Sequence, residues 1–116
     1  MNECVEDRAM TDTIQVFVTA GSREEARTIA GAVVEQRLAA CVQVVGPIHS
    51  TYWWQGQMET AEEYLCLMKT NRRVYRSLEV AIKDVHSYGT PEILAMPVTE
   101  GNEDYLRWMQ GELRGQ

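Results

Sequence analysis

His86 is the residue of this sequence best suited to bind a metal ion. It stands at the junction between a helical pattern and a predicted strand, close in the chain to Tyr88 and Glu92. An imidazole ring is a good ligand for copper or zinc. The alternative is a histidine at the end of a helix, with its ring bonded to the last carbonyl groups of that helix. The sequence leaves both interpretations open.

Cys41 is the second candidate ligand, because a thiolate suits Cu(I). Cysteine also packs readily as a small apolar side chain, and we prefer that interpretation for Cys66. If a tight turn at Gln55-Gly56 joins two paired strands, Cys66 lies opposite Val45, about 13 Å along the strand from Cys41. Two thiols at that separation cannot share a metal ion within one subunit, unless a bulge shifts the register.

Further polar side chains could line a cleft. Alternation along the predicted return strand puts Glu63 and Lys69 on one face of the sheet, where they form a polar pair in a cleft or are simply solvated. His49 is predicted to lie opposite Glu62, and there we expect a cross-strand ion pair rather than a metal contact.

The length and composition predict one globular domain, and the absence of catalytic motifs predicts that it is not an enzyme. The chain has 116 residues, 45% of them apolar, and this is enough to build a core without a cofactor. A net charge of −6 disfavours nucleic acid as a partner. We find no nucleophile motif, phosphate-binding loop, closed zinc spacing, signal peptide or membrane span. An odd count of three cysteines favours a reducing compartment, so we expect a cytoplasmic protein.

The pattern of elements predicts an α+β fold. Residues 1–12 show no periodicity and are predicted to be a flexible tail, followed by one domain over residues 13–116. A strand begins at Thr13, and a capping box of Ser22 and Glu25 begins a helix that reaches about Arg37.

A long β-hairpin is predicted next, over residues 38–54 and 57–69, with a bulge or bend at Gly46-Pro47. A helix that ends near Val85, a strand over residues 93–98 and a short helix from Asn102 follow. The order β-α-β-β-α-β with an extra C-terminal helix is typical of a split βαβ antiparallel sheet with helices on one face.

Both faces of this hairpin are predicted to be apolar. One face collects Val42, Val44, Ile48, Tyr52, Leu65 and Leu67, and the other collects Cys41, Val45, Trp53, Tyr64, Cys66 and Met68. Two helices cover only one face, and the last helix is too short to cover the other, so we expect a partner subunit there. Trp53 and Trp54 at the tip are predicted to be packing anchors between subunits rather than a platform for a ligand.

Several strings of the sequence resemble the CutA family of divalent-cation-tolerance proteins, in order and spacing over residues 14–113. They are Leu38-Ala39-Ala40-Cys41, Tyr52-Trp53-Trp54-Gln55-Gly56, Glu63 with Lys69-Thr70, His86-Ser87-Tyr88-Gly89-Thr90-Pro91-Glu92-Ile93, and Tyr105-Leu106-Arg107-Trp108.

The resemblance implies a ferredoxin-like fold, assembled as a tight homotrimer with His86 in a cleft between subunits. It also implies a role in tolerance of divalent cations, and copper binding is reported for the family. The trimer is similar to that of the PII signalling proteins, whose clefts between subunits bind small effectors. Where the family often has a proline, this chain has Ser87, which together with Gly89 predicts a looser loop.

Three alternative functions are therefore compatible with the sequence. The first is binding of copper or a similar divalent ion through His86, with Cys41 as a second ligand. The second is binding of a small effector in a cleft near His86, with Glu63, Lys69, Tyr88 and Glu92 as candidate contacts. The third is a trimeric adaptor whose metal affinity is incidental.

Overall fold

The computed structural model describes residues 12–115, which form a four-stranded antiparallel sheet with helices. The predicted tail, apart from Asp12, lies outside the described residues, as does Cys4. The elements in chain order are β1 (Thr13–Ala20), α2 (Arg23–Glu35), β2 (Cys41–Trp54), β3 (Gln57–Asn71), a 3-10 turn (Arg72–Val74), α3 (Tyr75–Val85), β4 (Ile93–Pro97) and α4 (Glu103–Glu112). The strand order β2-β3-β1-β4 confirms the predicted ferredoxin-like fold.

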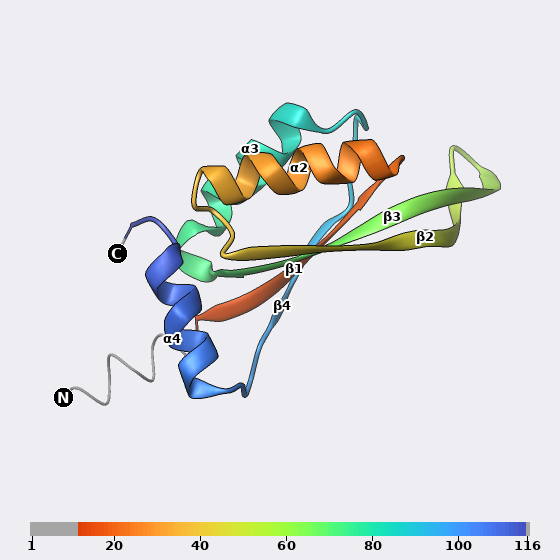
Figure 1. The fold of residues 1–116 in the computed structure, drawn as a ribbon. Helices are drawn as coiled ribbons and strands as arrows, with labels where there is room; N and C mark the ends of the chain where they lie inside the picture. The colour runs from red at the N-terminus through yellow and green to blue at the C-terminus, as the bar shows by residue number, and fades with distance from the viewer. Residues whose placement is uncertain (1–11, 116) are drawn as a thin grey trace.

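The two long helices, α2 and α3, lie on the same face of the sheet, whereas α4 lies apart from them, at the end where β1 begins (Figure 1). The core fills the space between the sheet and α2 and α3. Its largest fully buried side chains include Ile29 from α2, Ile82 from α3, and Val16 and Met68 from the sheet. This layering leaves most of the opposite face, which we call the second face, without a helix over it.

Ser22 caps the start of α2 as predicted, but the reciprocal hydrogen bond of Glu25 goes to a different N–H group. The Ser22 hydroxyl accepts a hydrogen bond from the Glu25 N–H at 3.0 Å, as predicted. The Glu25 carboxylate accepts from the N–H of Gly21 at 3.1 Å rather than from that of Ser22. The helix ends at Glu35, and Arg37 follows it with a left-handed φ of 58°.

The hairpin turn is the predicted two-residue turn. Gln55 and Gly56 both have positive φ, 50° and 81°, which is the geometry of a type I′ turn, and Trp54 pairs with Gln57. At the predicted bulge, two residues of β2, Gly46 and Pro47, stand opposite a single residue of β3.

This bulge corrects the predicted register. Beyond it Val44, and not Val45, pairs with Cys66, and Cys41 pairs with Lys69. Because the side chains of a strand alternate, a slip of one residue moves them to the opposite face. The predicted grouping was therefore wrong for the residues of β2 before the bulge: Val42 and Val44 join Cys66 and Met68 on the core face, and Cys41 and Val45 lie on the second face. The second face also carries Ile48, Tyr52, Leu65 and Leu67, which were correctly predicted to share one face.

The second face is nonetheless apolar and open. Phe17, Leu65 and Leu67 form its half-buried centre, and Val45, Leu94 and Met96 around them are exposed. Only its far end, near Cys41, is covered by α4.

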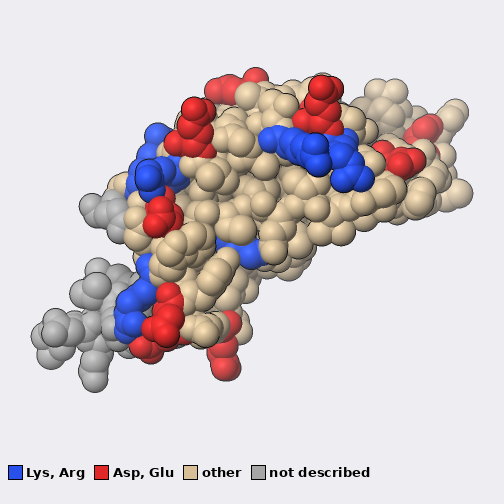
Figure 2. Space-filling view, in the orientation of Figure 1, with Lys and Arg blue, Asp and Glu red and all other residues tan. Residues whose placement is uncertain are grey.

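The outer part of the hairpin forms an arm with no other strand beside it. β1 pairs with residues 64–71 of β3, so residues 48–63 of the hairpin pair only with each other in the described chain. A two-stranded arm is marginally stable by itself in water. In the view of Figure 2, charged side chains gather over the helices, and few lie along the hairpin. The arm and the second face thus offer a continuous surface for another subunit.

Candidate functional site

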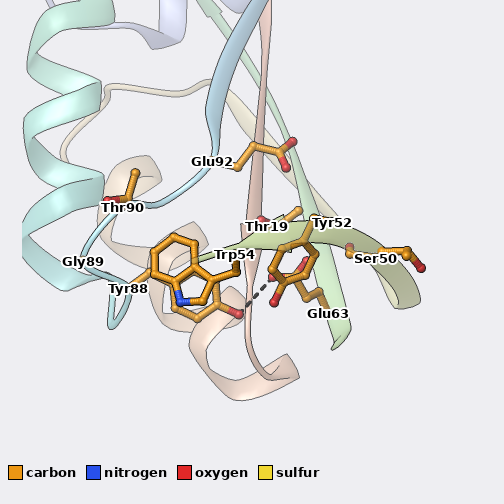
Figure 3. A pocket seen from close by; sticks show the side chains of 10 residues that line it. Thr19, Ser50, Tyr52, Trp54, Glu63, Tyr88, Gly89, Thr90 and Glu92 are labelled. Carbon is orange, nitrogen blue, oxygen red and sulfur yellow. Dashed lines mark hydrogen bonds between the residues drawn. The ribbon is translucent and has the colours of Figure 1, made fainter. Parts of the chain in front are cut away.

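A cavity of about 610 Å³ lies where the arm meets the loop between α3 and β4 (Figure 3). The strands contribute Thr19, Ser50, Thr51, Tyr52, Trp54 and Glu63, and the loop contributes Tyr88, Gly89, Thr90 and Glu92. The cavity borders the second face, because Thr19 pairs with Leu65 and Glu63 pairs with Ile48. Three of the predicted cleft residues, Glu63, Tyr88 and Glu92, are thereby brought together.

A hydrogen bond joins Tyr88 and Glu63, which both line the cavity. The Tyr88 hydroxyl donates a hydrogen bond to Oε2 of Glu63 at 2.9 Å. Glu63 is a buried residue, with only 6% of its surface exposed. Burial, together with this bond and the nearby charge of Glu63, raises the pKa of Tyr88 to about 12. The phenol therefore keeps its proton at neutral pH and acts as a donor.

The loop from Ser87 to Gly89 is held by a carboxylate of α2. Glu25 accepts a hydrogen bond from the Ser87 N–H at 2.7 Å and another from the Gly21 N–H at 3.1 Å. Burial by itself would raise the pKa of Glu25, but these hydrogen bonds and the nearby His86 outweigh it, so the pKa is lowered. These hydrogen bonds restrain the loop at Ser87, where the sequence predicted a looser loop.

His86 lies inside the protein with both ring nitrogens occupied. Its side chain is 0% exposed, and Nδ1 accepts a hydrogen bond from the Tyr88 N–H at 3.1 Å. Nε2 therefore carries the hydrogen and donates to the Thr19 carbonyl at 2.7 Å. His86 does cap α3, but its ring bonds to β1 rather than to the last carbonyls of the helix. In this arrangement neither nitrogen is open to a metal ion.

Cys41 lies at the other end of the second face. It is half-buried at the start of β2, near the ring of Tyr105 in α4. Burial, with a further contribution from Cys41, raises the pKa of Tyr105. Cys41 pairs with Lys69, which donates a hydrogen bond to Gln43 at 2.5 Å. The structure thus does not bring Cys41 and His86 together within one chain.

Lys69 does not contribute to the cavity, although alternation correctly placed it on the same face as Glu63. The two residues are about 20 Å apart along β3. His49 pairs with Glu62 as predicted, but their side chains form no ion pair within the described part of the chain. Among residues 12–115 there is no group of three or more His, Cys, Asp and Glu side chains that could hold a metal ion.

The two tip tryptophans lie on opposite faces of the arm. Trp54 lines the cavity, whereas Trp53 is 73% exposed and faces away from it. Trp54, Tyr52 and Ser50 were not predicted as cavity residues. They alternate along β2 on the face that carries Glu63, and the register set by the Gln55-Gly56 turn already places them there.

Fold and sequence comparisons agree on the class of protein. The molecule is a ferredoxin-like α+β protein with a long hairpin arm and a cavity at the root of that arm. Residues 14–112 match the family described as CutA1 divalent ion tolerance protein. The chain belongs to this family, which confirms the resemblance found in the sequence.

Individual relatives match over most of the chain. A divalent-cation tolerance protein CutA of Thermus thermophilus is 46% identical over 95 residues, which are 82% of this chain and 92% of that protein. The structure of a Thermus thermophilus Cut A1 protein has a TM-score of 0.86 at 44% identity, and covers 87% of this chain and 98% of its own. The structure of CutA1 from Oryza sativa has a TM-score of 0.89 at 35% identity, and the match covers 93% of this chain and 99% of the Oryza sativa chain.

The relatives are not confined to one compartment. A CutA 1 protein of Oryza sativa is named as chloroplastic, and a CutA structure from Archaeoglobus fulgidus is named as periplasmic. Within residues 12–115, none of the helices has the length and apolar character needed to cross a membrane. A cytoplasmic location stays a prediction.

Proposed function

We propose that this chain forms a homotrimer that contributes to tolerance of divalent cations, and that it binds copper or a similar ion rather than catalysing a reaction. Membership of the CutA1 family supports the link to divalent cations. The uncovered apolar second face carries the proposal of assembly, because Val45, Leu94 and Met96 gain from burial there.

The metal site of this proposal is shared between subunits. No sufficient group of ligands exists within the described part of one chain, so a second subunit has to complete the coordination. Cys41 is only half-buried and lies at the edge of the second face. His86 would have to give up its bonds to Thr19 and Tyr88 before it could bind an ion. We therefore assign Cys41 to the site first.

Calorimetric titration with copper under reducing and non-reducing conditions tests this metal site. Cys41→Ser should weaken binding, whereas His49→Gln, which changes an exposed histidine of the hairpin, should leave it unchanged. A variant that dissociates the assembly, such as Leu94→Glu, should lose binding while retaining its circular dichroism spectrum. Equal copper affinity in the dissociated and assembled forms would overturn the shared site.

His86→Gln tests the remaining predicted ligand. Lower copper affinity with an unchanged unfolding temperature would make His86 a ligand. A lower unfolding temperature with unchanged copper affinity would instead assign it to holding the loop.

A second candidate function is binding of a small effector, as in a PII-like trimer. The cavity favours it, since about 610 Å³ is within the usual size of a small-molecule site, about 300–1,000 Å³. Binding to the folded state raises the unfolding temperature. A panel of metabolites should therefore contain compounds that stabilise the wild type but not a variant with a blocked cavity, such as Gly89→Trp. A flat response would count against this function.

A further inference from the structure

Glu63 is a buried carboxylate without a cationic partner. It is 6% exposed, and its hydrogen bond from Tyr88 engages only Oε2. Within residues 12–115 it forms no ion pair with a Lys, Arg or His side chain. Burial of a carboxylate is costly unless a positive charge or several hydrogen bonds compensate it. The other oxygen, Oε1, accepts no hydrogen bond from the described residues, and because no buried side-chain oxygen there lacks a partner, it is accessible to a ligand or solvent.

The walls of the cavity around this carboxylate are aromatic. Tyr52, Trp54 and Tyr88 all line it, and aromatic ring faces attract cations, Trp most strongly. A second carboxylate, that of Glu92, lines the cavity too and stands well apart from the Tyr88–Glu63 bond (Figure 3).

The rest of the lining is neutral. Thr19, Ser50, Thr51 and Thr90 add hydroxyl groups, and Gly89 adds no side chain. No Lys, Arg or His belongs to this described lining. Two carboxylates and three aromatic rings without a basic side chain disfavour an anionic ligand and favour a cationic one.

We propose that this cavity selects a small organic cation with an ammonium head group, which binds Oε1 of Glu63 and packs against the rings of Tyr52, Trp54 and Tyr88. The proposal rests on the second candidate function, ligand binding in the cavity, and names the class of ligand. An ammonium group donates hydrogen bonds that Oε1 can accept, and its positive charge strengthens a hydrogen bond to a carboxylate. Its apolar substituents pack against the aromatic rings of the lining.

Three probes that share a four-carbon chain test the selection by charge. Butylammonium, 1-butanol and butyrate differ chiefly in the charge and chemistry of the head group, and their binding to the full chain can be measured by ligand-observed NMR at constant ionic strength. We expect butylammonium to bind at least about tenfold more tightly than 1-butanol, with butyrate the weakest, because a hydrogen bond to a charged group contributes about that factor. Tetramethylammonium, in a parallel titration, distinguishes a quaternary head group from a primary one.

Variants locate the binding. Glu63→Gln keeps an oxygen for the Tyr88 hydroxyl but removes the charge, and should weaken butylammonium binding about tenfold or more. Trp54→Leu should weaken it as well, and this change leaves the carboxylate in place. Glu62→Gln, one residue away on the opposite face of the arm, should bind like the wild type and serves as the control.

The outcomes distinguish a failure of the ammonium proposal from a failure of the second candidate function, ligand binding in the cavity. If 1-butanol or butyrate binds as tightly as butylammonium and Trp54→Leu weakens both, the cavity binds ligands but the ammonium proposal is wrong. If none of the probes binds and the metabolite panel is also flat, both the proposal and the second candidate function are wrong. If Glu63→Gln changes the mass of the assembly but not butylammonium binding, the partner of the carboxylate is another subunit, and the proposal is overturned.

Discussion

The Tyr88 hydroxyl donates a 2.9 Å hydrogen bond to Glu63 and so joins the loop before β4 to strand β3. The two residues are 25 positions apart in the sequence, and both line the cavity. Tyr88→Phe should lower the free energy of unfolding by about 1–3 kcal/mol, because it leaves a buried carboxylate oxygen without its donor. Urea denaturation measures this change. Tyr64→Phe is the control, since no hydrogen bond of its hydroxyl is present in the described chain, and a similar loss in that variant would contradict the role of the bond.

The raised pKa of Tyr88 predicts a dependence of stability on alkaline pH. In the folded state the Tyr88 hydroxyl has a pKa of about 12, whereas a tyrosine in the unfolded chain has a pKa of about 10. The folded state therefore binds more protons between these values, and stability should fall as the pH rises through this window. Unfolding temperatures measured between about pH 9 and about pH 12 should fall more steeply for the wild type than for Tyr88→Phe. Parallel curves would contradict the assignment.

Glu25→Gln should destabilise the loop at neutral pH. The lowered pKa of Glu25 means that its charged form is favoured in the folded state, so its contribution is present above about pH 4.3 and is lost as the pH falls through the lowered value. We expect faster amide hydrogen exchange at Ser87 and Gly21, which Glu25 binds. Glu24→Gln, in the same helical turn, is the control. Unchanged exchange at Ser87 would show that the tether is not needed.

The bulge depends on a glycine. A Cβ atom at Gly46 would collide with the ring of Tyr64, whereas one at Gly31, on α2, would meet nothing within 4 Å. Gly46→Ala should therefore cost about 1–3 kcal/mol of stability through overpacking. Gly31→Ala should raise stability by about 0.5–1 kcal/mol, because alanine favours a helix. Thermal unfolding of both variants is the check, and an equal response would contradict the packing at the bulge.

The same bulge shows what the sequence could and could not predict. Alternation, capping residues and the Gln55-Gly56 turn predicted every strand and helix, because these signals are local. The Gly46-Pro47 dipeptide predicted an irregularity in the strand. The number of extra residues in the bulge, however, is set by the pairing of β2 with β3 and by the packing around Tyr64. The resulting slip moved Val42 and Val44 from the predicted face of Leu65 and Leu67 to the face of Cys66 and Met68.

The site was predicted less completely than the fold. Glu63, Tyr88 and Glu92 were placed near one another, but Lys69 lies at the other end of the face, since alternation gives the face and not the distance. His86 was considered a ligand or a helix cap, and it instead holds the loop against the Thr19 carbonyl. That contact joins residues distant in the sequence, so no local pattern contains it.

The second face should also respond to charge. Leu94 on this face is 53% exposed in the single chain, and Val80 on the outer side of α3 is 60% exposed. Leu94→Glu should dissociate the assembly, because a charge at a buried interface is costly, whereas Val80→Glu should leave it intact. Sedimentation velocity distinguishes these outcomes. Dissociation by both variants, or by Val80→Glu alone, would place the interface elsewhere.

The most direct test of the account is the mass of the wild-type protein in solution. Size-exclusion chromatography with multi-angle light scattering, over a range of concentrations, gives this mass without assumptions about shape. We expect three times the mass of one chain, with the second face and the arm buried between subunits. The mass of a single chain at every concentration would contradict it, since the apolar second face would then stand permanently in water.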